Sequence, residues 1–296
     1  MENKSILIIG AGALGSVFLE NSRGMFKKVG IFDGDIVSKS NLLTQPFYSG
    51  CDFSSPISKT SFAVGKMSSL DSSTEYQGYE RYFTESDFRI MKEYDIIADF
   101  TDNVKSRLTI NEGCIREGKP AVFASLNDKE GFLYFYEGNA CFNCLFRNSI
   151  GRVKEGCESM ISAPEKEFIT FLMESVSEFV SGGIKGSEIR VFNLANKKIL
   201  KSTVKRDPEC EACARHTSNS LGNGFIQICS SGIKFSYGKG IDLGVLSGRL
   251  SGSKLYGEYL VYNKGNKSML VSLEGDFLFS GYSKSEAEEL IHSFLA

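Results

Sequence analysis

The sequence lacks an excess of charge of either sign. Its 296 residues include 34 lysines and arginines and 36 aspartates and glutamates, and the formal net charge is −2. Proteins that bind nucleic acids or anionic membrane surfaces usually gather basic residues into a patch or stripe, and this even mixture offers none. We therefore expect no nucleic-acid partner and no membrane partner.

Long hydrophobic runs are also missing. No segment approaches the roughly 18 apolar residues that a membrane-spanning helix needs. At the N-terminus, glycines interrupt the apolar run of MENKSILIIGAGALG too early for a secretory signal. These absences predict a soluble, cytoplasmic protein. In that reducing compartment, the eight cysteines are expected to be free, catalytic or metal-bound rather than paired in disulfides.

The first half of the chain instead contains an alternation of short apolar segments and segments of helical character. The predicted strands are 5–9, 29–33, 95–102, 120–126 and 130–138, and the predicted helices are 14–22, 58–70, 103–118 and 165–182. Strands that alternate with helices imply crossover connections between parallel strands. The expected fold class is therefore α/β, with a doubly wound, mainly parallel, Rossmann-like sheet.

The character of the sequence changes toward the C-terminus, where short strand-like segments are separated by glycine turns. We expect a first domain over residues 1–221 and a small C-terminal α+β unit over residues 222–296, β-rich and closed by one helix. That helix begins at SKSE, which resembles a capping box with Ser283 as the cap and Glu286 reaching back. Residues 147–165 lack clear periodicity and predict a long loop of the kind that is often functional.

A glycine-rich turn follows the first predicted strand. GAGALG places Gly10, Gly12 and Gly15 just before a helix, where backbone amides can approach a phosphate and the helix dipole favours negative charge. Asp33, at the end of the second strand, stands where this fold can hold a ribose hydroxyl. The alternatives are a glycine turn that serves packing alone and a solvated acidic turn. The pattern alone does not separate a dinucleotide from a mononucleotide.

Two CxxC pairs predict a metal site. Cys141 and Cys144 lie in CFNCLF, and Cys210 and Cys213 lie in CEAC. Four thiolates can close a tetrahedron around Zn²⁺, and such closed sites are structural. The alternative is two pairs of buried thiols. His216 is a conceivable ligand, but four sulfurs already complete the site.

As a set, these motifs resemble the ThiF/MoeB/HesA family, the bacterial relatives of ubiquitin-activating enzymes. The resemblance covers roughly residues 5–216 and rests, in this order, on IIGAGALGS, DGDIVSKSNLLTQ, SK before a helix, DIIADFTDN, CFNCLF and CEAC. It implies adenylation of the C-terminal carboxylate of a small ubiquitin-like sulfur carrier or a ribosomal peptide by ATP, giving acyl-AMP and pyrophosphate. It also implies a homodimer or a heterodimer.

The resemblance assigns roles to individual residues. Gly10, Gly12 and Gly15 match the nucleotide loop, Asp33 the acid that binds ribose, Asn41 a triphosphate contact, Lys59 the phosphate-binding lysine, and Asp102 the acid that holds Mg²⁺. The chemistry of this reaction explains why these residue types are needed. A carboxylate that attacks the α-phosphate of ATP brings two anions together, so a cation and a metal-holding acid are needed to screen the charge.

A cysteine in the 147–165 loop is a further candidate. Cys157 matches a cysteine that takes part in acyl or sulfur transfer in the resembling enzymes, and Lys154 and Arg152 could lower its pKa. The alternative is an incidental loop cysteine.

The sequence departs from the family pattern at two phosphate-binding arginines. Thr44 stands where the family has arginine in NLxRQ, and the arginine that precedes the family's first strand has no counterpart. Arg107, Lys66 or a partner subunit could supply the missing charge. Two other functions stay open: a catalytically weakened nucleotide-binding or scaffold subunit, and an NAD-dependent oxidoreductase. The oxidoreductase leaves Asn41, Lys59 and Asp102 without a role.

Overall fold

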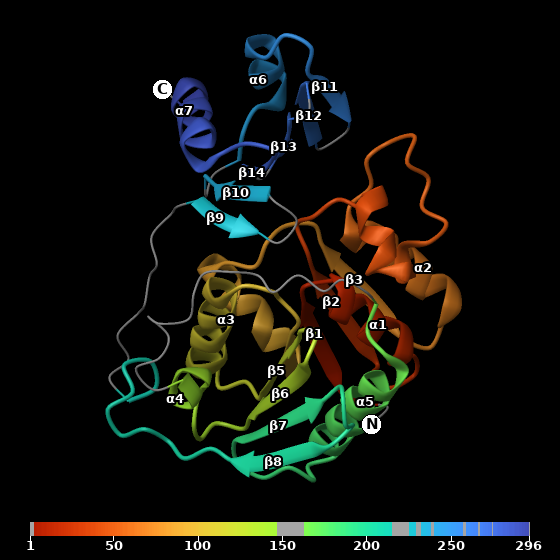
Figure 1. Cartoon of the computed structure of the whole chain (residues 1–296), viewed down its shortest axis with the longest axis vertical. Coiled ribbons are helices and arrows are strands. Elements are labelled where there is room, and N and C mark those ends of the chain that lie inside the picture. Colours follow the sequence, from red (N-terminus) through yellow and green to blue (C-terminus); the bar gives the residue numbers. More distant parts are fainter. Residues whose placement is uncertain are drawn as a thin grey trace. The chain divides into compact units, whose positions relative to one another are not determined.

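The computed structural model describes residues 3–146, 163–214, 225–228, 232–237, 240–256, 259–265, 267–273 and 275–295. The described residues up to 214 belong to one compact unit, and those from 225 onward belong to a second. Figure 1 labels the helices and strands of both units. The boundary that we predicted between residues 221 and 222 lies outside the described residues.

The first unit is built on an eight-stranded sheet with the order β3-β2-β1-β4-β5-β6-β7-β8. Its strands are β1 (Ser5–Ile9), β2 (Lys28–Phe32), β3 (Glu75–Tyr79), β4 (Ile96–Asp99), β5 (Ala121–Leu126), β6 (Glu130–Tyr136), β7 (Glu188–Asn193) and β8 (Ile199–Thr203). The pairs from β3 to β5 are parallel, and those from β5 to β8 are antiparallel. This mostly parallel sheet confirms the predicted fold class.

Helices cover both faces of this sheet (Figure 1). They are α1 (Ala13–Asn21), α2 (Lys59–Leu70), α3 (Val104–Glu117), α4 (Phe142–Phe146) and α5 (Lys166–Val180), with the 3₁₀ helices η1 (Lys39–Leu43), η2 (Pro46–Tyr48) and η3 (Glu85–Glu93). Side chains alternate across a strand, so Ile6 and Ile8 pack in one core cluster with α1, α2 and α5. Leu7 and Ile9 pack in the other, with α3, α4 and η3.

The α-helices α2 and α3 begin at side-chain caps. Ser58 precedes α2, and its hydroxyl accepts a hydrogen bond from the Ser61 N–H at 2.9 Å. Asn103 precedes α3 and accepts from the Ser106 N–H at 2.8 Å. Such caps satisfy backbone donors that have no partner inside the helix, and they fix where each helix starts. The start of α2 is Lys59, and the cap therefore sets the position of this lysine.

The second unit is a six-stranded antiparallel sheet with the order β11-β12-β13-β14-β10-β9. Its elements are β9 (Phe225–Ile228), β10 (Gly232–Ser236), α6 (Leu243–Arg249), β11 (Lys254–Tyr256), β12 (Tyr259–Lys264), β13 (Lys267–Ser272), β14 (Asp276–Ser280) and α7 (Lys284–Leu295). The predicted capping box is confirmed: the Ser283 N–H donates to Glu286 at 2.8 Å, and the Glu286 N–H donates to the Ser283 hydroxyl at 3.3 Å. Sequence reasoning missed α6, which is short and glycine-bearing.

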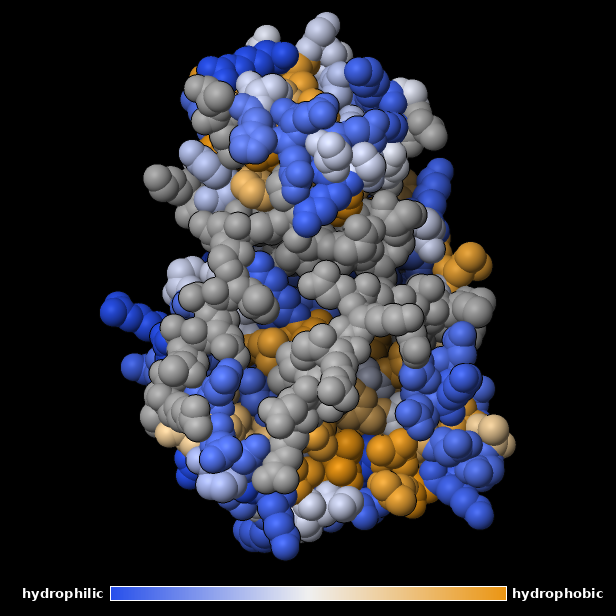
Figure 2. All heavy atoms as spheres, turned by 60° about the vertical axis from the view of Figure 1, so that its left-hand side comes forward, coloured by the Kyte–Doolittle hydropathy of each residue, from blue (hydrophilic) through white to orange (hydrophobic). Residues whose placement is uncertain are grey.

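The surfaces of the two units differ on the face drawn in Figure 2. Hydrophilic residues cover most of the described surface of the second unit, whereas hydrophobic residues reach the surface at several places on the first. Within the residues that the structure describes, every helix is too short or too polar to cross a membrane.

Candidate functional site

Glycine is required in the turn between β1 and α1 and again in the first turn of α1. Gly10 has a φ of +96°, and a Cβ there would lie 2.9 Å from the carbonyl carbon of Phe100. A Cβ at Gly15 would lie 1.9 Å from the Gly10 carbonyl oxygen. At Gly12, by contrast, apart from the adjoining residues and the backbone of α1, no atom of the described residues lies within 4 Å of where a Cβ would stand. Gly12 is the N-cap of α1, so this open space lies at the positive end of a helix and suits a phosphate.

Asp33 follows β2 and is held against this turn. Its Oδ2 accepts a hydrogen bond from the Ala11 N–H at 2.7 Å, and its Oδ1 accepts from the Asp35 N–H at 2.8 Å. The side chain is buried. Burial raises the pKa of Asp33 to about 6, although the positive charge of Lys59 acts in the opposite direction. The carboxylate thus stands beside the glycine turn, where a ribose-binding acid is expected.

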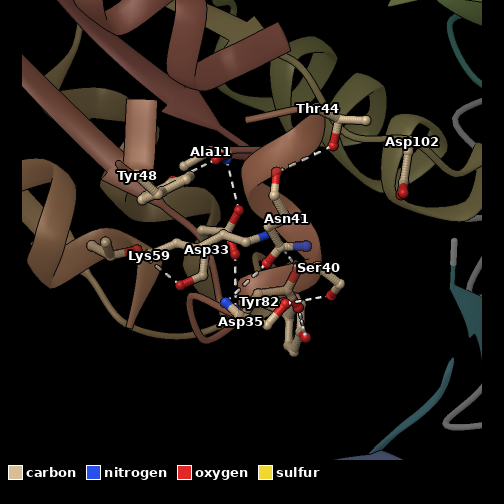
Figure 3. Close-up of polar contacts among 12 residues, drawn as sticks. Ala11, Asp33, Asp35, Ser40, Asn41, Thr44, Tyr48, Lys59, Tyr82 and Asp102 are labelled. Carbon is tan, nitrogen blue, oxygen red and sulfur yellow. Dashed lines mark hydrogen bonds and ion pairs between the residues drawn. The ribbon is translucent and has the colours of Figure 1, made fainter. Parts of the chain in front are cut away.

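Lys59 is buried at the start of α2 and forms an ion pair with an acid that sequence reasoning did not single out. Its Nζ lies 2.9 Å from Asp35 Oδ2, and the Tyr82 hydroxyl donates to Asp35 Oδ1 (Figure 3). Burial lowers the pKa of Lys59, but the charges of Asp35 and Asp33 outweigh it and raise the pKa above its ordinary value. The ammonium group is therefore charged and oriented before any ligand arrives.

Asn41 lies in η1, between this group and Thr44 in the view of Figure 3. Its Oδ1 accepts a hydrogen bond from the Ser38 N–H at 3.1 Å and closes a capping box. Its backbone carbonyl accepts from the Thr44 N–H at 3.1 Å and from the Thr44 hydroxyl at 3.4 Å. The carboxamide oxygen of Asn41 thus serves the local turn, and its amino group is the part suited to donate to a phosphate.

Asp102 is exposed on the turn between β4 and α3. β1, β2 and β4 are parallel, so Gly10, Asp33 and Asp102 follow the carboxyl ends of strands at one edge of the sheet. Figure 3 shows Asp102 apart from the Asp33 and Lys59 group. Its charge nevertheless contributes to the raised pKa of Lys59, after burial and the nearer acids. An exposed carboxylate at this edge of the sheet is a group that Mg²⁺ can use, since Mg²⁺ usually takes one or two carboxylates along with substrate phosphates.

The two cations that could have compensated for Thr44 are bonded to other groups. Arg107 is buried, and its Nη2 donates to the carbonyl of Ala124 at 2.8 Å and to that of Thr101. Lys66 donates to the carbonyl of Phe47 at 2.7 Å and lies 3.3 Å from Glu20. These contacts favour neither side chain as a phosphate ligand.

The four cysteines of the CxxC pairs form one buried cluster. The Sγ atoms of Cys141 and Cys144 lie 3.8 Å apart, those of Cys141 and Cys210 3.6 Å, and those of Cys144 and Cys213 3.5 Å. All four lie within 4.8 Å of one another. A tetrahedron with Zn–S bonds of about 2.3 Å has edges of roughly 3.8 Å, so the cluster could hold zinc. The Asp207 N–H also donates to Cys144 Sγ at 3.4 Å.

Hydrogen bonds from three elements fix the turn that carries the first CxxC pair. The Ala140 carbonyl accepts from the Tyr134 hydroxyl at 2.8 Å and from the Ser187 hydroxyl at 2.7 Å. Asn111 of α3 accepts from the Phe142 N–H at 2.8 Å and donates to Asn143 at 3.0 Å. The protein thus orients these cysteines through its own contacts.

Some candidates lie outside the described residues. These are Cys157, its neighbours Arg152 and Lys154, and His216. The role of Cys157 therefore stays a prediction. Sequence reasoning also missed Tyr48, whose hydroxyl donates to the Ala11 carbonyl at 2.6 Å and steadies the glycine turn.

Among curated proteins, the chain is similar to adenylyltransferases. The chain is 38% identical over 148 residues to the adenylyltransferase and sulfurtransferase MOCS3 of Dictyostelium discoideum, covering 49% of this chain and 34% of that protein. It is 26% identical over 228 residues to the sulfur carrier protein adenylyltransferase of Thermus thermophilus, covering 72% of this chain and 83% of that protein. The chain thus spans about a third of the length of the MOCS3 relatives that it matches.

Solved structures share the fold. MccB of E. coli, in complex with AMPCPP and MccA, superposes with a TM-score of 0.58 at 17% identity, over 72% of this chain and 67% of that chain. PaaA superposes with a TM-score of 0.55 at 14% identity, over 68% of this chain and 64% of that chain. At these identities the likeness concerns the fold alone. The model of the ThiF family matches residues 1–219, most of this sequence, and the chain belongs to the ThiF family.

Proposed function

We propose that the protein uses ATP to adenylate the C-terminal carboxylate of a small sulfur-carrier protein or a ribosomal peptide. The observation that carries this proposal is the open space at Gly12, at the positive end of α1. Asp33 is hydrogen-bonded to the preceding residue, Ala11, and the charge of Lys59 acts on Asp33. The names of the relatives, adenylyltransferase and sulfur carrier protein adenylyltransferase, support the same chemistry.

In the proposed reaction, a carboxylate oxygen attacks the α-phosphorus of ATP. The bond from that phosphorus to the bridging oxygen of pyrophosphate breaks, and acyl-AMP and pyrophosphate leave. Lys59 and the first backbone amides of α1 would offset the charge of the two approaching anions, while Asp33 would accept hydrogen bonds from the ribose. Asp102 would hold the magnesium ion that accompanies ATP, and this ion when bound screens phosphate charge.

We also propose that Cys141, Cys144, Cys210 and Cys213 hold a structural zinc ion. Four cysteine ligands leave no open coordination position for a substrate, so this ion would act on stability rather than on the reaction.

Isotope exchange tests the proposed activity. The protein is incubated with ATP, Mg²⁺ and radiolabelled pyrophosphate, with either a carrier protein ending in Gly-Gly or a ribosomal peptide, and label in ATP is measured. We expect exchange that depends on the carboxylate and stops when the substrate's C-terminus is amidated. Exchange that is equally fast without a carboxylate substrate would contradict the proposal.

The positions of the nearby cations favour a second candidate, a nucleotide-binding scaffold subunit with weak turnover. Thr44 replaces a phosphate-binding arginine, and both Arg107 and Lys66 have partners within the protein. ATP binding by calorimetry, together with no exchange for any carboxylate until a second family member is added, would favour this candidate.

Assembly and location remain proposals. We propose a homodimer, with a heterodimer as the alternative, because the resemblance implies one. Sedimentation at micromolar concentration is expected to show twice the mass of the chain, and a persistent monomer would contradict it. A cytoplasmic location also stays a prediction.

A further inference from the structure

Arg107 crosslinks the carboxyl ends of two neighbouring strands. It projects from the first turns of α3, and its Nη2 donates both to the carbonyl of Thr101, just after β4, and to the carbonyl of Ala124, in β5. The guanidinium group is buried. One planar, permanently charged side chain thus holds two backbone segments at a fixed separation, which a single ammonium group does poorly.

A buried carboxylate, that of Asp99, also holds Thr101 in place and pairs with Arg107. Asp99, at the end of β4, is fully buried, and its Oδ1 accepts hydrogen bonds from the Thr101 N–H at 2.8 Å and the Thr101 hydroxyl at 2.6 Å. Its Oδ2 lies 3.6 Å from Arg107 Nη1. Within the described part of the chain, these two buried atoms have no hydrogen bond, so the ion pair is what compensates their charges.

The turn held in this way touches the glycine turn and carries Asp102. We call residues 100–103 the Asp102 turn. The glycine at position 10 is required because a Cβ there would lie 2.9 Å from the Phe100 carbonyl and 3.1 Å from the Thr101 nitrogen. A shift of Thr101 would therefore alter the distance between the glycine turn and Asp102.

From these contacts we infer that Arg107 is a positioning residue that acts through Asp102. With Asp99 and Thr101 it holds the Asp102 turn against the glycine turn, so that the Asp102 carboxylate stands ready beside the phosphate site. This inference rests on the proposed function, because it concerns the activity of that site. It gives Arg107 a role other than phosphate binding.

A double-mutant cycle tests the inference. Arg107→Lys keeps the charge beside Asp99 but cannot bridge both carbonyls, and Arg116→Lys, on the exposed face of the same helix, is the matched control. We expect Arg107→Lys to lower kcat of carboxylate-dependent exchange about 10-fold with KM for ATP changed less than about twofold, and Arg116→Lys to change neither. In the Asp102→Asn background, adding Arg107→Lys should lower kcat by less than about a further twofold. A loss of the same size in both backgrounds would overturn the inference.

Hydrogen–deuterium exchange supplies a measurement that does not depend on activity. The Thr101 amide is hydrogen-bonded to Asp99, so Arg107→Lys should speed exchange over residues 100–103 at least ~10-fold, and Arg116→Lys should not. Unchanged protection in Arg107→Lys would overturn the inference even if the wild type proved inactive. Absence of pyrophosphate exchange in the wild type, with altered protection in Arg107→Lys, would contradict the proposed function alone.

Should Arg107→Lys fail to fold, Thr101→Val replaces it. Valine keeps the volume of threonine and removes the hydroxyl bond to Asp99. Thr109→Val is its control, because the Thr109 hydroxyl bonds the Lys105 carbonyl within α3. We expect a roughly threefold loss of kcat for Thr101→Val alone, abolished in the Asp102→Asn background. Equal effects of the two substitutions would overturn the inference.

Discussion

At the scale of single residues, Lys59 is the clearest test of the phosphate site. It is buried and paired with Asp35, whereas Lys66, about two helix turns further along α2, is partly exposed and bonded to Phe47 and Glu20. We expect Lys59→Met to lower kcat/KM for ATP about 100-fold, since it removes the charge that offsets the phosphates. Lys66→Met should change it less than about twofold, and equal losses would contradict this reading of the site. Initial rates of pyrophosphate exchange measure both.

The raised pKa of Asp33 predicts a pH dependence of stability. Because burial lifts its pKa from 3.8 to about 6, the folded protein binds this proton more tightly than the unfolded chain. The stabilisation that this bound proton gives the folded state is therefore present below pH 4 and is lost as pH rises toward 6. Relative to Asp33→Asn, the wild type should lose about 2–3 kcal/mol of unfolding free energy between pH 4 and 7, measured by urea titration.

Asp71 serves as a control because its pKa is shifted in the opposite direction to that of Asp33. Hydrogen bonds from Ser73, Gly24 and Thr74 hold the pKa of this carboxyl below its ordinary value against the effect of burial. Relative to Asp71→Asn, the wild type should gain stability as pH rises from about 2 to 5. A parallel trend for both aspartates would contradict the assignment of the Asp33 effect to burial.

Motifs predicted which residues to consider as site residues, but they did not predict the contacts among them. Asp33 and Asp102 each stand in a recognisable string just after a strand end, and Lys59 stands in one at the start of α2. The ion pair of Lys59 with Asp35 joins the start of α2 to the loop after β2, and the Tyr82 hydroxyl reaches Asp35 from the loop after β3. No sequence pattern marks either contact.

At the scale of elements, Gly15 and Gly12 at the start of α1 differ in what surrounds them. A Cβ at Gly15 would overlap the Gly10 carbonyl, whereas a Cβ at Gly12 would point into open space and its backbone φ of −71° suits alanine. We expect Gly15→Ala to lower the melting temperature by more than about 5 °C. Gly12→Ala should melt within about 2 °C of the wild type but bind ATP at least ~10-fold more weakly.

Calorimetry of both variants checks this pair. A Gly12→Ala protein that binds ATP as tightly as the wild type would mean that the phosphates do not lie at the α1 N-terminus. A Gly15→Ala protein with unchanged melting would mean that the close approach of α1 to the Gly10 carbonyl is relaxed in solution.

Elements with strong apolar patterns were predicted, and those without them were missed. β1, β2, β4, β5 and β6 are apolar runs buried in the sheet, and all five were expected. The sequence of β3, EYQGY, is polar because it forms one edge of the sheet. β8, at the other edge, is exposed along its whole length. Edge strands bury little apolar surface, so periodicity does not reveal them.

At the scale of the whole molecule, the four-cysteine cluster predicts a measurable dependence on metal. Protein purified without chelator is expected to contain about one zinc ion per chain, as measured by inductively coupled plasma mass spectrometry. Because structural zinc sites contribute directly to folding, removal by a chelator, or Cys210→Ser, should lower the melting temperature by more than about 5 °C. Cys114→Ser, which alters a buried thiol outside the cluster, should leave the zinc content unchanged. Zinc-free protein with wild-type melting would refute the assignment.

The cluster also has a topological consequence. Cys144 and Cys210 belong to segments far apart in the sequence, and the chain between them includes α5, β7 and β8. With zinc bound, that stretch becomes a ring closed by coordination bonds, and a disulfide closing a ring of this kind restricts the unfolded chain by about 4 kcal/mol. A ring closed by zinc needs no oxidant to form and no reductant to open. The ring would be closed only when zinc is available in the cell. If a protease cut the chain within the ring, the bound zinc would still hold the two fragments together.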